Sequence, residues 1–226
     1  MAENESILEN KLIHELATGD SQWTYRPDLK TEDDLWNNIR EKLGNMNSHK
    51  LDGHPITDSE MEQIKSFIKE KAESTYKAAV WLSGERGLAQ IPLSREDASL
   101  GQLHLDAISN RDIAGGHSTY EIINQYQSRK QDDTDRNRRF DVTLLINGFP
   151  MIHIELKNQS HPYKEAFNQI KKYLTQGKFR GLFGLVQMFV VTNGVDTKYI
   201  AANDDPEKLN EKFLSTWVDK NNNPVR

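Results

Sequence analysis

The chain has 226 residues, no cysteine and a formal net charge of −5. This length fits one large domain with a substantial buried core. The lack of cysteine excludes disulfides and cysteine-ligated zinc and is compatible with a reducing cytoplasm. No apolar run approaches the ~20 residues of a membrane span, so we expect a soluble cytoplasmic protein. The acidic balance also argues against a free-standing, high-affinity DNA binder.

Two helices are predicted before residue 50. From Ser6 to Ala17, leucine and isoleucine recur at helical spacing, and a glycine follows as a stop signal. Thr31 is a favourable N-cap for a second helix that ends near Leu43. The segment between them, Gln22–Lys30, contains a proline, so we expect irregular structure there.

A longer helix is predicted after a loop at Ser48–Ile56. Thr57 and Glu60 have the spacing of a capping box, and apolar residues continue at helical intervals to about Trp81. These helices would form a mostly helical insert over about residues 31–83. The sequence indicates no chemistry for this insert, and we expect it to pack on the core or to contact other domains.

The pattern is weaker from Gly84 onwards. We expect one strand at Gln102–Ile108, a clearer one at Tyr120–Gln127, and a polar loop at Ser128–Asn137. The histidines have no spacing typical of metal ligands, and none is assigned a role. They include His104, His117, His153 and His161.

The stretch Arg139–Lys157, RFDVTLLINGFPMIHIELK, predicts a β-hairpin. Its first arm alternates in strand fashion, and the pair Asn147-Gly148 favours the positive φ angles of a hairpin turn. In the second arm one face carries Ile152, Ile154 and Leu156, and the other carries His153, Glu155 and Lys157. Antiparallel pairing puts position 141 opposite position 156, within one residue. Asp141 is therefore expected beside Glu155 and Lys157 at the open end.

Charged residues in this arrangement indicate a metal site. Two neighbouring carboxylates repel each other unless a cation lies between them, and oxygen ligands on strands suit Mg²⁺ or Mn²⁺. The ammonium of Lys157 would orient a water and offset charge on a phosphate, which is the chemistry of phosphodiester hydrolysis. The alternative is an ordinary cross-strand ion pair, since the same tripeptide pattern occurs at Glu9-Asn10-Lys11.

The last third predicts one amphipathic helix and further strands. Lys164–Gln176 has a helical stripe and places Gln169 and Tyr173 one turn apart on one face. We expect a central strand at Leu185–Thr192, an edge strand at Tyr199–Ala202 and a terminal helix at Glu207–Trp217. Cations gather near the hairpin despite the acidic total, namely Lys157, Lys164, Lys171, Lys172, Lys178 and Arg180.

Asp141, followed by Glu155-Leu156-Lys157, resembles the signature of PD-(D/E)xK nucleases, and Gln169 with Tyr173 resembles the Gln-x-x-x-Tyr motif of their RecB-like branch. The match is closest to the N-terminal nuclease region of type I restriction enzyme R subunits and is dense over about residues 120–202. The resemblance implies an α/β (α+β) fold with a mixed central sheet flanked by helices. It also implies a single endonuclease domain over residues 1–226, with a catalytic core at about 118–202.

The resemblance implies roles as well. Asp141, Glu155 and the Leu156 carbonyl would hold Mg²⁺ (Mn²⁺ as a substitute), Lys157 would position water, and Gln169 and Tyr173 would align the DNA strand, with Glu9 as a possible outer ligand. The implied partners are double-stranded DNA, the modification and specificity subunits, and motor domains of the same subunit. ATP would act only through those motor domains, because no phosphate-binding Gly-x-x-x-x-Gly-Lys-Ser/Thr loop occurs in this chain.

Two other functions stay open at this point. One is a non-catalytic module that uses the nuclease fold to bind DNA or partner domains. The other is a stand-alone repair or recombination nuclease of the same superfamily. Loss of a motif residue would favour the first, and robust cleavage by the isolated domain would favour the second.

Overall fold

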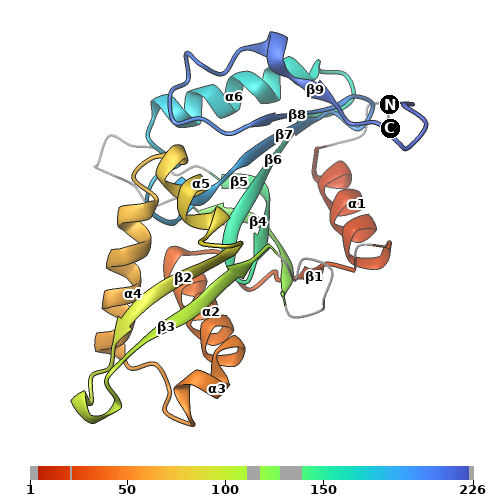
Figure 1. Cartoon of the computed structure of the whole chain (residues 1–226). Helices are drawn as coiled ribbons and strands as arrows, with labels where there is room; N and C mark the ends of the chain where they lie inside the picture. The colour runs from red at the N-terminus through yellow and green to blue at the C-terminus, as the bar shows by residue number, and fades with distance from the viewer. Residues whose placement is uncertain (1–4, 21, 111–117, 128–138, 224–226) are drawn as a thin grey trace.

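Figure 1 shows the computed structural model of the chain, which describes residues 5–20, 22–110, 118–127 and 139–223. The loop expected at Ser128–Asn137 and the histidine at position 117 lie outside these ranges. The helices are α1 (Glu5–Thr18), α2 (Glu32–Met46), α3 (Ser48–Leu51), α4 (Asp58–Lys71), α5 (Thr75–Ser83) and α6 (Tyr163–Thr175). The strands are β1 (Thr24–Tyr25), β2 (Leu88–Ser94), β3 (Gln102–Ser109), β4 (Tyr120–Gln127), β5 (Arg139–Ile146), β6 (Phe149–Leu156), β7 (Met188–Thr192), β8 (Thr197–Ala201) and β9 (Ser215–Thr216).

The described strands form a seven-stranded mixed sheet in the order β1-β4-β5-β6-β7-β8-β9 and a separate β2-β3 pair. Strands β4, β5 and β6 form an antiparallel meander, whereas β6 and β7 are parallel. A parallel pair needs a crossover connection, and α6 supplies it between β6 and β7. The prediction of a mixed central sheet flanked by helices is therefore confirmed.

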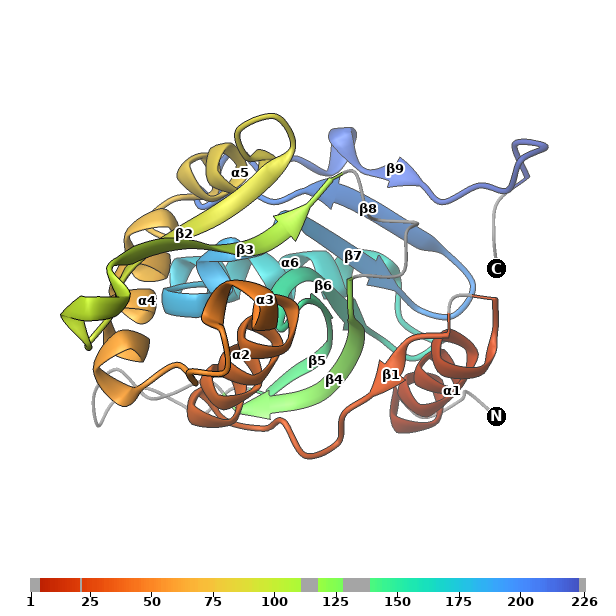
Figure 2. The ribbon, with the colours of Figure 1, turned by 60° about the horizontal axis from the view of Figure 1, so that its bottom comes forward.

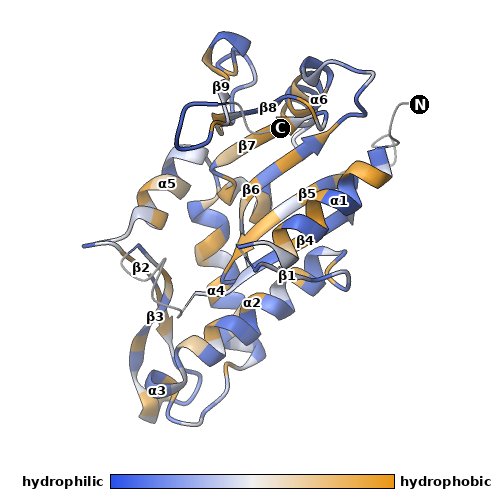
Figure 3. Cartoon of the chain, turned by 90° about the vertical axis from the view of Figure 1, so that its right-hand side faces the viewer, coloured by the Kyte–Doolittle hydropathy of each residue, from blue (hydrophilic) through white to orange (hydrophobic). Residues whose placement is uncertain are grey.

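Each face of the sheet is covered by different helices, as Figures 1 and 2 show. One face packs on α2, α4, α5 and α6 in a large apolar core that includes Leu35, Ile64, Phe140, Phe149 and Ile170. The opposite face packs on α1 in a smaller core that includes Leu8, Ile13, Val142, Ile154 and Val190. Orange stretches on β5 and β7 in Figure 3 mark hydrophobic residues in the middle of the sheet, as expected where both faces are covered.

The helices of the expected insert contribute directly to the larger core. Leu35, Ile39 and Leu43 on α2 and Ile64 and Ile68 on α4 belong to the same buried cluster as the strand residues. Residues 31–83 therefore share one continuous hydrophobic core with the sheet.

The two predicted helix starts are correct in detail. Thr31 and Thr57 both have extended backbone angles, and each forms a reciprocal capping box with the residue three positions on, Asp34 and Glu60 respectively. These bonds satisfy backbone groups that the first helical turn leaves unpaired.

The predicted helix from Thr57 to Trp81 is wrong in its continuity. It is interrupted after Lys71, and Ser74 caps a new helix, α5, by accepting a hydrogen bond from the Lys77 N–H. The interruption lets Trp81 turn onto Phe149, with 5.8 Å between the ring centroids. The loop predicted at Ser48–Ile56 also contains the short helix α3.

Two segments differ from the sequence-based expectation, namely the strand before Gln102 and the segment after Glu207. Strand β2 was not predicted; it pairs with β3 along its whole length. The predicted terminal helix at Glu207–Trp217 does not form, and this segment has a single 3₁₀ turn at Glu211–Phe213 and the short edge strand β9. Strand β8 is consequently an inner strand. Apolar contacts such as Tyr199 on Trp217, at 5.4 Å, decide this conformation over helical propensity.

The hairpin forms as predicted, with a small shift in register. Asn147 and Gly148 have φ angles of +52° and +83°, as a two-residue hairpin turn requires. A bulge between Leu144 and Leu145 follows, and beyond it Val142 pairs with Ile154. Position 141 consequently falls opposite position 155, within the one-residue margin of the prediction.

No helix in the described ranges combines the length and the apolar character needed to cross a membrane.

Candidate functional site

The open end of the β5-β6 hairpin brings the two motif strands together. The backbone N–H of Leu156 donates a hydrogen bond to Oδ2 of Asp141, with 2.9 Å between the atoms. Regular pairing has ended at this point, since Val142–Ile154 is the last paired position of the two strands. The aspartate side chain therefore takes the place of a ladder partner and holds the ends of the strands together.

Glu155 is completely buried on β6. Its Oε2 atom lies 3.0 Å from Nε2 of His153, and its Oε1 atom has no hydrogen-bond partner among the described residues. The Asp141 carboxyl and the Gln169 amide both approach this group and lower its pKa, but neither bonds Oε1. Burying a carboxylate oxygen without a hydrogen-bond partner costs free energy. Such an atom indicates a position where an ion or a water molecule binds.

The acidity of both carboxyl groups is strongly perturbed. Burial raises the pKa of Asp141 to about 7, and the negative charge of Glu155 adds to the increase. Burial also raises the pKa of Glu155 to about 8, against the opposing effect of the Lys157 ammonium. The protein without a cation therefore favours protonated carboxyls near neutral pH, and a divalent cation would favour the ionised pair.

His153 lies in the same buried group, although sequence reasoning assigned it no role. Its ring is packed against Phe140, Phe179 and Phe189, and Thr143 Oγ1 lies 3.4 Å from Nδ1. Burial lowers the pKa of His153 to about 4, so the imidazole is neutral. The sequence signal for this contact is the spacing of two residues between His153 and Glu155, which places both side chains on one face of the strand.

Lys157 lies at the edge of the site. Its Nζ atom is 3.1 Å from the Leu156 carbonyl oxygen and 3.6 Å from Oε1 of Glu5. Its side chain keeps 15% of its accessible surface, so it reaches solvent. The ammonium of Lys157 therefore lies between the solvent and the buried carboxyl of Glu155.

Two glutamates of α1, Glu9 and Glu5, lie near the sheet in different surroundings. Glu9 is buried, and its two oxygens accept hydrogen bonds from Asn124 Nδ2 and Gln125 Nε2 at 2.6 and 2.7 Å. Both partners belong to β4, so Glu9 braces that strand. The carboxylate of α1 that faces Lys157 is Glu5, in the first helical turn.

Gln169 and Tyr173 face the sheet from α6. Gln169 Nε2 donates to the Tyr173 hydroxyl at 2.6 Å, and that hydroxyl donates to the Arg139 carbonyl at 3.4 Å. Tyr173 is buried and packs on Phe140. The pair thus connects the helix to the strand that carries Asp141. Of the predicted cationic surface, Lys178 is buried and does not belong to it.

The donor set at this site fits one hard divalent cation. Oxygen atoms come from Asp141, Glu155 and the Leu156 carbonyl, and the bare Oε1 of Glu155 supplies an uncompensated acceptor. The described residues contain no group of three or more His, Cys, Asp or Glu side chains that would enclose a metal. Such a site leaves coordination positions for water and substrate oxygens, as Mg²⁺ prefers.

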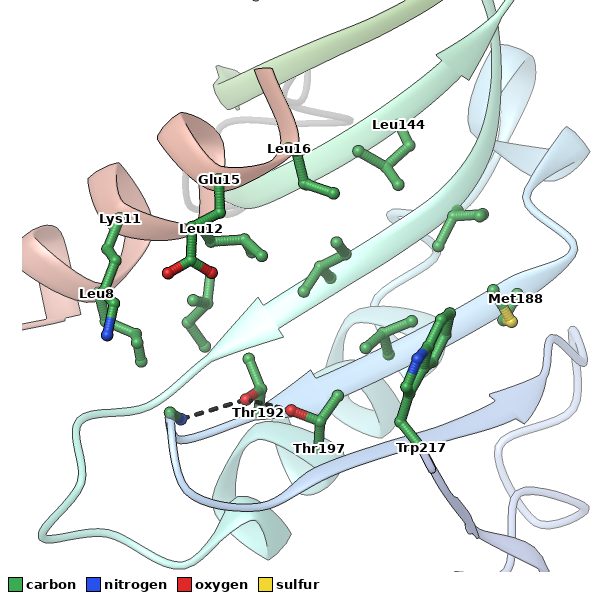
Figure 4. A pocket seen from close by; sticks show the side chains of 15 residues that line it. Leu8, Lys11, Leu12, Glu15, Leu16, Leu144, Met188, Thr192, Thr197 and Trp217 are labelled. Carbon is green, nitrogen blue, oxygen red and sulfur yellow. Dashed lines mark hydrogen bonds between the residues drawn. The ribbon is translucent and has the colours of Figure 1, made fainter. Parts of the chain in front are cut away.

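An apolar hollow lies elsewhere, between α1 and the sheet (Figure 4). Leu8, Leu12 and Leu16 of α1 face Leu144 and Met188 of the sheet, and Trp217 closes one side. The Leu156 side chain lines this hollow, whereas its backbone groups contact Asp141 and Lys157. Alternation along β6 therefore keeps the apolar hollow and the polar site on opposite faces of the sheet.

A mixed sheet with an aspartate on one strand, Glu-x-Lys on the next and a crossover helix carrying Gln-x-x-x-Tyr is the arrangement of the PD-(D/E)xK nuclease fold. Residues 2–208 match the family model described as "Type I restriction enzyme R protein N terminus". The chain belongs to this family.

Individual relatives agree with the family match. The chain is 33% identical over 224 residues to the type I restriction enzyme SauCOLORF180P endonuclease subunit of Staphylococcus aureus (strain COL), covering 99% of this chain and 22% of that protein. It is 31% identical to the SsaAORF53P endonuclease subunit of Staphylococcus saprophyticus, again covering 99% and 22%. It is 27% identical to the EcoprrI endonuclease subunit of Escherichia coli, covering 99% and 67%. The chain thus spans about a fifth of the length of the staphylococcal relatives.

Proposed function

We propose that this chain is a Mg²⁺-dependent endonuclease domain that hydrolyses phosphodiester bonds of double-stranded DNA within a type I restriction complex. The observation that carries the proposal is the buried Oε1 atom of Glu155, which has no partner among the described residues and belongs to a carboxyl beside Asp141. The printed names of the relatives, which call them endonuclease subunits of type I restriction enzymes, support it.

In this proposal each residue of the hairpin end has its own task. Asp141, Glu155 and the Leu156 carbonyl would hold the cation, which when bound would acidify water and neutralise charge on the phosphate. Lys157 would hold the attacking water and stabilise negative charge from the solvent side of the site. Gln169 and Tyr173 would fix α6 against β5 and so align the DNA strand.

The domain would have no sequence specificity of its own. Cations beside the hairpin, on α6 and after it, would contact phosphates, which carry no sequence information. They are Lys157, Lys164, Lys171, Lys172 and Arg180. Recognition of a DNA sequence would come from specificity and modification subunits, and translocation from ATP-driven motor domains of the same subunit.

Cleavage by the full-length subunit in its assembled complex tests the proposal. Asp141→Ala, Glu155→Ala and Lys157→Ala should each reduce double-strand cleavage by at least about 100-fold, because each removes a charged group at the reacting phosphate. ATP-dependent translocation should be unchanged. Lys69→Ala, an exposed lysine on α4, is the matched control and should cleave normally.

Cleavage that persists in any one of the three variants removes that residue from the mechanism. Cleavage that persists in both carboxylate variants would overturn the proposal and favour a docking role for the fold.

A further inference from the structure

The imidazole of His153 and the carboxylate of Glu155 form a fully buried pair that the proposed chemistry does not itself require. Both side chains have no accessible surface, and Nε2 of His153 lies 3.0 Å from Oε2 of Glu155. The two residues are i and i+2 on the central strand β6, so the strand itself brings them to one face. This contact defines how Glu155 is presented.

The ring is held in place on several sides. Phe140 and Phe179 pack on it at centroid distances of 4.9 and 5.2 Å, and Phe189 lies edge-on at 6.5 Å. Nδ1 is 3.4 Å from the hydroxyl of Thr143. Close packing of aromatic rings and the hydroxyl contact restrict rotation of the imidazole.

The contacts also assign the tautomer. When Glu155 is ionised, as cation binding requires, its oxygens only accept hydrogen bonds, so the imidazole proton that faces it is on Nε2. Nδ1 is then the acceptor for the Thr143 hydroxyl. This chain of donors runs from Thr143 through His153 to Glu155 and ends on Oε2.

The geometry leaves Oε1 as the oxygen of Glu155 without a hydrogen-bond partner among the described residues. We propose that His153 is a positioning residue that occupies Oε2 and thereby presents Glu155 to a divalent cation through Oε1 alone. The inference rests on the proposed function, because it specifies how one of the proposed ligands is oriented. Ligand carboxylates in metal sites are commonly held by such outer hydrogen bonds, whose loss weakens metal binding.

Calorimetric titration of Mn²⁺ into the chain tests the inference without a cleavage assay. His153→Phe keeps an aromatic ring inside the Phe140, Phe179 and Phe189 cluster but removes the donor. It should weaken Mn²⁺ binding by about 10- to 100-fold. His153→Gln restores an N–H donor at nearly the position of Nε2 and should recover most of that loss, whereas a purely structural role would not distinguish the two variants in this way.

Thermal unfolding of each metal-free variant shows whether it folds. Nitrogen-15 NMR of the wild-type protein measures directly which imidazole nitrogen of His153 carries the proton. The variant His153→Gln is needed only to assign the His153 signals. We expect His153 to carry its proton on Nε2 in the presence of Mg²⁺ and its signals to shift when the ion is added.

The outcomes separate this inference from the proposed function. Wild-type binding that is lost in Glu155→Ala but unchanged in a folded His153→Phe would overturn the inference alone. An Nδ1-protonated tautomer in the presence of Mg²⁺, or signals unmoved by the ion, would do the same. No binding by the wild type would overturn both the inference and the proposed cation site.

Discussion

The backbone N–H of Leu156 and the carboxylate of Asp141 are joined by a 2.9 Å hydrogen bond at the point where the β5-β6 ladder ends. This bond fixes Asp141 beside the strand that carries Glu155. It is a side-chain bond, separate from the backbone hydrogen bonds that pair the two strands. A cation bound there would meet two carboxyls held by rigid strands. Four predictions test this arrangement and its support.

Metal affinity should depend strongly on pH. The pKa values of Asp141 and Glu155 are raised to about 7 and about 8, so protons compete with a cation for both groups near neutrality. Mn²⁺ affinity should rise by roughly 100-fold per pH unit near pH 6 and by less than about tenfold per unit near pH 8, because binding displaces up to two protons. Calorimetry in two buffers of different ionisation enthalpy measures this release. Affinity that is independent of pH would contradict the assignment of these carboxyls as ligands.

The stability of the metal-free chain should fall as pH rises. A carboxyl whose pKa is higher in the folded than in the unfolded state stabilises the fold fully below its unfolded pKa of about 4. For Asp141 and Glu155 this contribution disappears as the pH rises through their folded-state pKa values of about 7 and about 8. Glu155→Gln should therefore raise the free energy of unfolding at pH 8 by on the order of 2 kcal/mol and change it little at pH 5.

Urea unfolding with a chelator at both pH values measures this effect. Glu15→Gln, which changes an exposed carboxylate on α1, is the control. An equal change for Glu155→Gln at pH 5 and pH 8 would argue against a perturbed carboxyl.

Glu9 should matter for stability and little for metal binding. Glu9→Ala leaves the amides of Asn124 and Gln125 without their acceptor, which should cost about 2 kcal/mol. Glu15→Ala on the same helix is exposed and should cost less than about 0.5 kcal/mol. Chemical denaturation gives both values. A large loss of Mn²⁺ affinity in a stable Glu9→Ala protein would instead make Glu9 an outer ligand.

The hairpin turn should not tolerate a side chain at Gly148. Its φ is +83°, and an added Cβ would lie 3.1 Å from Ile39 Cγ1 and 3.3 Å from Asn38 Nδ2. Gly148→Ala should destabilise by about 1–3 kcal/mol, because both the backbone angle and the contact with α2 are unfavourable.

Gly44 on α2 is the matched control for this substitution. An added Cβ there meets no atom within 4 Å, so Gly44→Ala should stabilise by about 0.5–1 kcal/mol. Unfolding midpoints that move in the same direction for both variants would refute the steric explanation.

Local sequence signals predicted the elements that depend on local interactions. The capping boxes at Thr31 and Thr57, the Asn147-Gly148 turn and the strand periodicity around Asp141 all formed as expected. Each depends on residues within a few positions of one another. By contrast, the break between α4 and α5 and the non-helical segment at residues 207–217 are decided by contacts with distant residues.

The sequence by itself determined the hairpin, its register within one residue and the proximity of Asp141 to Glu155, because side-chain alternation and turn geometry are local properties. Only the tertiary structure decided that Glu9 bonds β4 while Glu5 faces Lys157, since helical periodicity does not specify where along the sheet a helix docks. It also decided the surroundings of His153. The aromatic cluster that fixes its ring comes from β5, β7 and the segment after α6, and packing alone brings these together.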